Sequence, residues 1–373
     1  MVVNDVRGLK VEFHILQSFP VTCLNRDDVG APKTAVVGGT IRARVSSQCW
    51  KRAVRIMMRE LMGEDNFHLG KRTKYISQLV AKRCQELGAN KEQSKVCGDA
   101  IASKLSGKKD ERDSNQTDTL LFISPSEIEK ICQFLKEKGF SHGVIKNVTI
   151  KDMLELRSGS RSAMDAYDIA LFGRMVAVEP ILNIEGATSF SHAISTHKIV
   201  NEIDFFTAVD DEIQEKEDET GSAHMGILEY NSATYYRYVG VNVTQLYETF
   251  GEDKGMTIDA MRYFIKALFL AVPTGKQASM AGLSGWDYAR IYVRRGQGLQ
   301  VMFDSAIRQG EHGGYLKKSR EFLRKYLEEK ERLYGSLFRK VSMFEIGEGA
   351  ENGVKCIDEL IDKIIIDVES HLV

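Results

Sequence analysis

One segment of the chain changes from a strand pattern to a helix pattern while it carries only positive charge. Residues 29–59 contain no aspartate or glutamate, and residues 40–45 alternate apolar and polar side chains. In a strand, this alternation predicts that apolar residues such as Ile41 face the core, and that Arg42 and Arg44 face outward. The segment therefore needs an anion, or carboxylates from distant parts of the chain, to balance its charge.

A helix is predicted from about residue 48, directly after Ser46 and Ser47, which favour a helix start. On one side of it, basic residues recur at four-residue spacing: Lys51, Arg55 and Arg59. The other side is predicted to bury Trp50, Val54, Met57 and Leu61. Like charges at this spacing cost stability, and a solvated surface helix normally mixes both signs. The segment thus combines strand arginines, a helix N-terminus and a basic helical stripe. This combination favours phosphate binding over a merely solvated surface.

The overall charge is balanced, which makes the local excess informative. The chain has 373 residues with 51 basic and 52 acidic side chains, so it is not a generally basic protein. No apolar run reaches the roughly 20 residues that a membrane-spanning helix needs, and the N-terminal residues lack an apolar signal core. We therefore expect a cytoplasmic globular protein, large enough for two lobes, that holds an anion in one place.

The cysteines and histidines do not predict a metal site. The six cysteines stand at positions 23, 49, 84, 97, 132 and 356, and none forms a C-x-x-C pair. His192 and His197 are close in sequence, but no second pair accompanies them. We expect free, buried thiols and no cofactor.

The order of the remaining patterns predicts the fold class. Strand patterns occur at residues 9–15, 168–175, 233–241 and 286–294. Helix patterns occur at residues 127–138, 257–271 and 354–372, and the first of these belongs to a charged helical region from about 60 to 165. Strands interleaved with helices, with a helical insertion, predict an α+β sandwich of the ferredoxin type.

Several motifs allow a catalytic interpretation beside a structural one. Asp27 and Asp28 follow the first strand and would suit a divalent metal, but such residues more often cap turns. His192, His197 and His224 would suit acid–base cleavage of RNA, although the sequence does not bring them together. Residues 273–277 resemble part of a phosphate loop but lack its first glycine and its hydroxyl, so only Lys276 remains as a phosphate contact.

Exposed aromatic and methionine side chains would provide stacking contacts for bases, although most such residues pack in cores. The candidates are Met175, Phe190, Phe205, Phe206 and Met225. An extended chain would point Phe205 and Phe206 to opposite sides, so that one of them is exposed.

Nine short sequence blocks lie at residues 24–28, 38–39, 42–48, 51–53, 168–171, 173–175, 191–197, 204–211 and 221–226. In this order they resemble the CasC family, the repeated backbone (crRNA-binding) subunit of the type I-E CRISPR Cascade complex. Each block alone is weak, but their ordered combination over about residues 10–240 is specific.

The resemblance implies a hand-like architecture. A ferredoxin-like, RRM-like palm is expected at residues 1–59 and 226–373. Helical fingers are expected at 60–184, ending in a return strand, and an extended thumb at 185–225. By the same resemblance, several copies stack along one guide RNA and kink it at regular intervals.

The candidate RNA-binding residues come from the basic segment and from the matched blocks. They are Asn25, Arg26, Lys33, Arg42, Arg44, Ser46, Gln48, Lys51, Arg52, Arg55, Arg174, Met175 and Met225. The resemblance implies a non-catalytic scaffold without metal or other cofactor. Its implied partners are guide RNA (crRNA), the target DNA strand paired to the guide, neighbouring copies of itself and other Cascade subunits, with no membrane.

Two alternatives remain open at this point. One is a metal-dependent endoribonuclease, for which Asp27, Asp28, Asp210 and Asp211 are the candidate ligands. The other is a general single-stranded nucleic-acid-binding protein that needs no guide.

Overall fold

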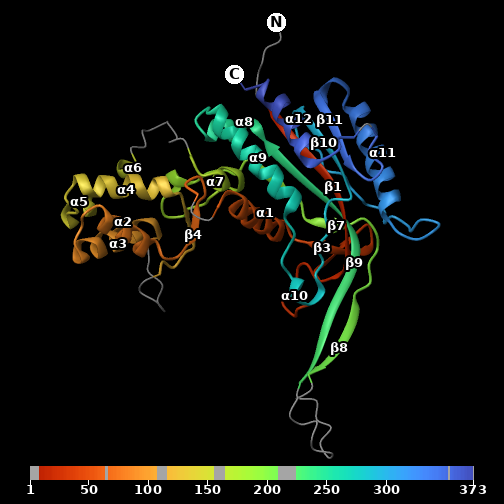
Figure 1. Ribbon diagram of the computed structural model, residues 1–373, viewed down its shortest axis with the longest axis horizontal. Coiled ribbons are helices and arrows are strands. Elements are labelled where there is room, and N and C mark those ends of the chain that lie inside the picture. The colour runs from red at the N-terminus through yellow and green to blue at the C-terminus, as the bar shows by residue number, and fades with distance from the viewer. Residues whose placement is uncertain are drawn as a thin grey trace, which may run out of the picture.

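The computed structural model describes residues 8–63, 66–106, 116–154, 164–208, 224–351 and 353–372. A large antiparallel sheet runs through the molecule in the order β11-β10-β1-β9-β7-β3-β2 (Figure 1). Its strands are β1 (Leu9–Thr22), β2 (Thr34–Val37), β3 (Thr40–Val45), β7 (Ala193–Ser195), β9 (His224–Asn242), β10 (Tyr288–Arg295) and β11 (Lys340–Gly347). Two further strands, β6 (Thr188–Phe190) and β8 (Glu202–Ala208), pair with β9.

Helices cover both faces of this sheet. The main core lies between the sheet and α1 (Ser47–Met62), α7 (Tyr167–Phe172), α8 (Val243–Thr249), α9 (Lys254–Leu270) and α12 (Ile357–Glu369). On the other face, α11 (Leu316–Tyr334) packs on tyrosines of β9 and β10. Because both faces are covered, β1 buries even the polar side chains of Glu12 and His14.

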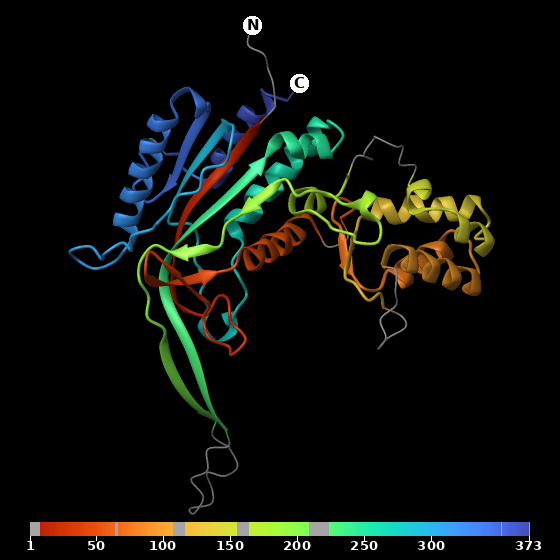
Figure 2. The same ribbon diagram turned by 180° about the vertical axis from the view of Figure 1, so that it is seen from behind.

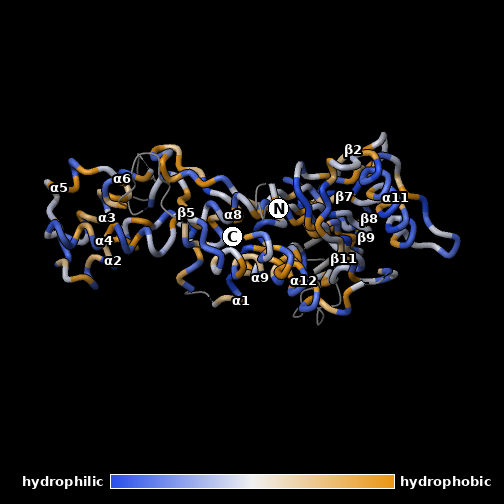
Figure 3. Tube along the Cα trace, turned by 90° about the horizontal axis from the view of Figure 1, so that it is seen from above, coloured by the Kyte–Doolittle hydropathy of each residue, from blue (hydrophilic) through white to orange (hydrophobic). Residues whose placement is uncertain are grey.

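A second, smaller body is built from helices and has a core of its own. It contains α2 (Ile76–Glu86), α3 (Lys91–Ser106), α4 (Pro125–Glu137), α5 (His142–Asn147) and α6 (Ile150–Met153). A two-stranded antiparallel sheet of β4 (Lys71–Thr73) and β5 (Leu121–Ile123) belongs to it. Seen from above, this helical body lies at one end of the elongated molecule and α11 at the other (Figure 3).

A β-hairpin projects from the end of the sheet that lies away from the two chain termini (Figure 1). β8 pairs with the first half of β9 in a register that joins Glu202 to Tyr230 and Phe206 to Gly226. The pair extends well beyond the other strands in both side views (Figures 1 and 2). Among the described residues, the remaining short elements are α10 (Gln277–Met280) and the 3-10 turns η1 (Pro180–Leu182) and η3 (Gly335–Leu337).

The expected fold class is confirmed in its coarse form, since helices and a large antiparallel sheet are combined in one mixed fold. The strands predicted at 9–15, 233–241 and 286–294 and the helices at 127–138, 257–271 and 354–372 are confirmed. The strand predicted at 168–175 is wrong, because residues 167–172 form α7. Its short apolar run is buried on all sides, so the sequence shows no alternation of apolar and polar residues. Without that periodicity, a strand and a helix cannot be told apart.

The side-chain directions predicted for β3 are also wrong in part. Arg42 is fully buried and Ile41 is exposed, which reverses the expected pattern, although Ala43 and Val45 are buried as expected. The Arg42 guanidinium donates hydrogen bonds to the carbonyl oxygens of Ser195 and Phe303, at 2.9 and 3.1 Å. Distant backbone covers this side of the strand, and its carbonyl groups replace solvent around the charge.

The inner side of α1 differs slightly from the prediction. Trp50 and Val54 are buried, but Met58 takes the place expected for Met57, and Leu61 is exposed. All six cysteines are free thiols, as expected, although Cys49 is only half-buried and Cys356 is exposed. In the described ranges, no helix has both the length and the apolar character needed to cross a membrane.

Candidate nucleic-acid interface

The N-terminus of α1 is built into the loop that follows β1. The Ser46 hydroxyl caps the helix by accepting a hydrogen bond from the Cys49 amide, at 3.3 Å. The side-chain oxygen of Asn25 accepts from the Ser46 amide at 2.9 Å and ties the helix start to the loop. The first turn of α1 carries no acidic residue. Its amide dipoles therefore leave a positive end without an internal counter-charge.

Three adjoining cavities follow α1 along its outer side, and we call them together the basic groove. Their volumes are about 570, 630 and 450 Å³. Arg52 lines the first and second cavities, and Arg55 and Arg72 line the second and third. Because neighbouring cavities have lining residues in common, the three lie in succession from the loop after β1 to the helical body.

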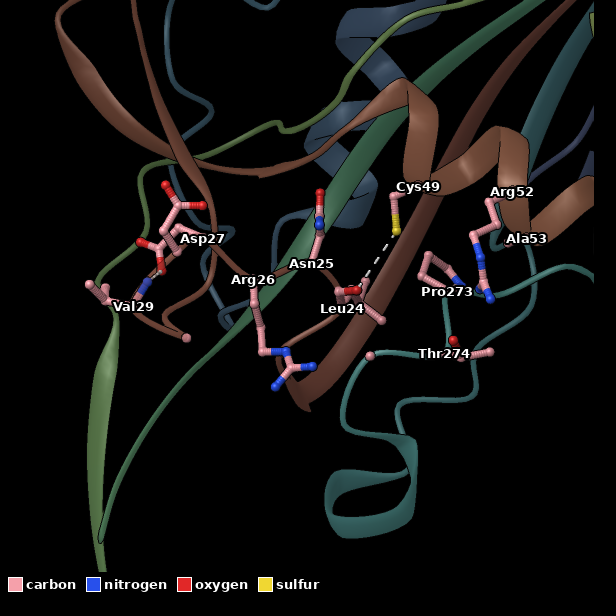
Figure 4. Close-up of a pocket in the computed structure, with 13 residues that line it drawn as sticks. Leu24, Asn25, Arg26, Asp27, Val29, Cys49, Arg52, Ala53, Pro273 and Thr274 are labelled. Atoms are coloured by element: carbon pink, nitrogen blue, oxygen red, sulfur yellow. Dashed lines mark hydrogen bonds between the residues drawn. The ribbon is translucent and has the colours of Figure 1, made fainter. Parts of the chain in front are cut away.

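The first cavity lies between that loop, α1 and the segment before α10 (Figure 4). Arg26 from the loop and Arg52 from α1 both line it and are exposed. The loop and the segment before α10 touch closely, since a Cβ on Gly275 would lie 2.5 Å from the Leu24 carbonyl oxygen. Only glycine fits that approach, so the wall of the cavity has a fixed position.

The second cavity sets basic side chains opposite apolar ones. Gln48, Lys51, Arg52, Arg55 and Arg72 line it together with Leu120, Phe122, Phe172 and Met175. Burial lowers the pKa of Lys51, whose ammonium lies 5.6 Å from the Phe190 ring centre. Met175 is 82% exposed, so its thioether is available to a ligand. This combination suits a single-stranded nucleic acid, because its phosphates bind cations and its bases stack on apolar side chains.

The third cavity continues onto the helical body. Arg59, Lys71, Arg72 and Tyr75 line it together with Arg55. The Arg59 guanidinium donates a hydrogen bond to the Gly70 carbonyl oxygen at 2.9 Å, so this residue also fixes the connection between α1 and β4.

A buried carboxylate lies behind the middle of the groove. Asp168 accepts a hydrogen bond from the Gly70 amide at 2.7 Å, and its second oxygen lies 4.0 Å from the Arg55 guanidinium. Burial raises the pKa of Asp168 to about 6, although the nearby hydrogen bond and arginines oppose that rise. Its negative charge is therefore available to Arg55 only where the carboxyl has lost its proton.

Most of the candidate residues line the groove, and a few have other surroundings. Asn25, Arg26, Gln48, Lys51, Arg52, Arg55, Arg174 and Met175 line it. Lys33 and Arg44 lie together on the β2–β3 side, where the Arg44 amide donates to the Lys33 carbonyl at 2.8 Å. Ser46 caps α1, and the side chain of Met225 lies outside the described residues.

Arg42 and Arg174 have protein partners for their charged groups. Arg174 is buried and forms a bidentate ion pair with Glu127, at 2.6 and 2.8 Å. Arg42 donates to backbone carbonyls, and burial lowers its pKa. Both residues hold segments together, so their guanidinium groups are not free for a ligand in this conformation.

His192, His197 and Asp27 each accept hydrogen bonds from the backbone. His192 accepts a hydrogen bond from the Ser47 amide at 3.2 Å, and His197 accepts from the Thr234 amide at 3.1 Å. Asp27 accepts from the amides of Val29 and Ala31, at 3.0 and 2.9 Å. Across the described ranges, no three His, Cys, Asp or Glu side chains are grouped so as to hold a metal. The side chain of His224 and all of Asp210 and Asp211 lie outside those ranges.

Sequence reasoning missed the part of the groove that the helical body contributes. Lys71 and Arg72 come from β4, which begins soon after α1 ends, whereas Phe122 comes from β5, which is distant in the sequence. The adjacent pair Lys71-Arg72 was a local signal, but its sequence alone did not show that it lies beside α1.

Comparison with known proteins places this geometry in context. A family model described as CT1975-like protein matches residues 11–363. A solved chain from a "CRISPR RNA-guided surveillance complex, pre-nicking" is similar, with 27% identity, a TM-score of 0.80, and coverage of 96% of this chain and 100% of that one. A chain from a "CRISPR RNA-guided surveillance complex" shares the fold, with 23% identity, a TM-score of 0.68, and coverage of 96% and 99%. No curated protein matches the chain significantly.

Proposed function

The chain belongs to the CT1975-like protein family, and on that premise we propose that it is an RNA-binding backbone subunit of a Cascade-type CRISPR surveillance complex. The basic groove along α1, a succession of three cavities with shared arginines, carries the proposal. A guide RNA has a different sequence in every complex, so its subunit must bind phosphates and sugars rather than particular bases. Exposed Arg26, Arg52 and Arg72 offer such contacts at three places along one path.

The finer architecture of this proposal is a hand. The strand order β10-β1-β9, with α9 after β9, supports a ferredoxin-like, RRM-like palm at residues 1–59 and 226–373. β7 continues this sheet, although its residues lie within the range proposed for the thumb. The helical body supports fingers within 60–184. β8 lies within the thumb proposed at 185–225, and its partner residues on β9 extend the projecting hairpin to Tyr230. The type I-E assignment and a cytoplasmic location belong to the same proposal.

We propose that the hairpin of β8 and β9 contacts a neighbouring copy on the same guide. One of its faces carries Ile203, Phe205 and Ile227, which are 57%, 68% and 63% exposed. Exposed apolar side chains on a projecting arm indicate a protein or nucleic-acid partner. Repeated head-to-tail contacts would build a filament that presents the guide to a target DNA strand beside other Cascade subunits.

A non-catalytic role is proposed in preference to the endoribonuclease alternative. Asp27 would have to release the amides of Val29 and Ala31 before its carboxylate could serve a metal. A general single-strand binder is the second alternative. In the assembled complex, competition between a guide RNA and a random oligomer of equal length separates it from a guide-dependent scaffold.

The groove is tested by charge reversal. The double variant Lys51→Glu, Arg52→Glu is expected to weaken binding of single-stranded RNA by at least about tenfold, because two attractive charges become repulsive. Filter binding or fluorescence anisotropy measures the affinity, and circular dichroism checks the fold.

The matched control reverses two exposed cations on α11, Lys325→Glu and Arg332→Glu, which lie on the other face of the sheet. The control is expected to bind RNA nearly as the unchanged protein does. Equal binding by the groove variant and the unchanged protein would remove the basic groove from the proposal.

A further inference from the structure

A buried arginine without a carboxylate partner lies beneath the start of α1. Arg237, on β9, is 2% exposed, and its guanidinium carbon lies 3.4 Å from the Trp50 ring centre. Its Nη1 donates to the side-chain oxygen of Gln17. Within the described part of the chain, no group accepts from its Nε or Nη2, and no carboxylate forms an ion pair with it. Burial lowers the pKa of Arg237 to about 9.

An isolated buried cation is costly, and the same sheet shows the usual solution. Arg294 is equally buried, but it pairs with Glu12 on the neighbouring strand. The stack on Trp50 and one neutral oxygen compensate Arg237 only in part. A charge kept at this cost indicates a counter-charge from outside the described residues.

Several observations indicate where that counter-charge binds. Trp50 lies in the first turn of α1, next to Lys51, which lines the basic groove. That turn has no acidic residue to offset the helix dipole. On the outer side of the helix start, burial together with the positive charges of Arg44 and Lys33 lowers the pKa of His192. Positive potential therefore surrounds the beginning of α1 on both sides.

We propose that Arg237 is a buried positioning residue of the basic groove: stacked beneath Trp50, it adds fixed positive potential at the start of α1 that a bound RNA phosphate compensates. Arg237 acts through the electrostatic field of its guanidinium and through its contact with Trp50, without touching the RNA. Low-dielectric surroundings extend the reach of its charge, whereas water screens the exposed lysines and arginines. This inference rests on the proposed function, since it assigns a residue to the same RNA site.

The test uses Arg237→Met, which keeps an unbranched but shorter side chain and removes the charge, and Arg237→Lys, which keeps the charge. We expect Arg237→Met to weaken binding of a labelled single-stranded RNA by about fourfold, the effect of one charge about 10 Å from a phosphate at an effective dielectric constant of about 40. Arg237→Lys should retain most of the affinity. Without RNA, Arg237→Met should be at least as stable to urea as the unchanged protein.

A purely structural role predicts the opposite stability result, because loss of the stack would destabilise the protein whether or not RNA binds. Unchanged RNA affinity in Arg237→Met, or equal losses of affinity in both variants, would overturn the inference.

A parallel titration with inorganic phosphate separates the two proposals. If the unchanged protein does not bind RNA, the proposed function fails. The inference about Arg237 is then decided by phosphate, which should raise the unfolding temperature of the unchanged protein more than that of Arg237→Met. Equal stabilisation of both proteins by phosphate would reject a buried contribution to anion binding.

Discussion

The two faces of the sheet treat arginine differently. On the α11 face, Arg290 and Arg324 share the buried carboxylate of Glu345, and Arg294 pairs with Glu12. On the α1 face, Arg237 has no carboxylate partner among the residues that the structure describes, and the groove residue Arg52 is exposed. The same residue type therefore stabilises the fold where acids surround it and remains available to an anion where they do not. Pairing distinguishes the two roles better than exposure alone.

The comparison is tested most strongly by removing a carboxylate from the α11 face. Glu345 accepts from the Tyr288 hydroxyl at 2.5 Å and from both arginines. Burial alone would raise its pKa, but the hydrogen bonds of Tyr288 and Arg324 hold it below the usual value. We expect Glu345→Gln to lower the free energy of unfolding by about 3 kcal/mol, because two arginines lose a buried counter-charge. Urea unfolding measures this loss.

The control for that variant is Glu328→Gln. Glu328 contacts Arg290 at 3.3 Å, but its side chain is 58% exposed, so its loss should cost less than about 1 kcal/mol. Equal effects of the two substitutions would show that buried pairing does not set the difference between the faces.

Asp168 gives a pH-dependent test on the α1 face. Its pKa in the folded protein, about 6, lies above its value in the unfolded chain, so the folded protein holds the proton more tightly. The stability that it contributes is complete below about pH 4 and is lost as the pH rises through about 6, with a total of up to about 3 kcal/mol.

In the variant Asp168→Asn, the side chain at this position does not titrate. The variant should therefore lack this contribution to the dependence of stability on pH. We expect the difference in unfolding free energy between the variant and the unchanged protein to change by that amount between pH 4 and 7, measured by urea unfolding at each pH. Parallel profiles would place Asp168 in a more polar environment than its burial indicates.

The smallest expected effect comes from one exposed groove cation. Arg72→Gln should weaken RNA binding by about fivefold, or about 1 kcal/mol, and lower the slope of log affinity against log salt by about 0.7, the value for one phosphate contact on a single strand. Arg332→Gln on α11 is the matched control. An unchanged salt slope in Arg72→Gln would mean that the RNA does not reach the helical body.

The sequence predicted the elements with strong periodicity and the chemistry of α1. The alternation in β1, the aromatic run in β9 and the amphipathic pattern in α9 identified those elements. The stripe of Lys51 and Arg55 identified one wall of the groove. The prediction of a strand at residues 168–175 was wrong because a short, buried apolar run has the same pattern in a strand and in a helix. The prediction that Arg42 faces outward was wrong because distant backbone covers its side of β3.

The sequence by itself determined where positive charge accumulates without acids and which segments form strands and helices, since both follow from neighbouring residues. Tertiary structure alone decided which cations are neutralised. Glu12, Glu127 and Glu345 lie far along the chain from the arginines they bind, whereas in the described segments no such acid reaches Arg237. Electrostatic pairing depends on distance in space, and the fold sets that distance by packing segments that are remote in the sequence.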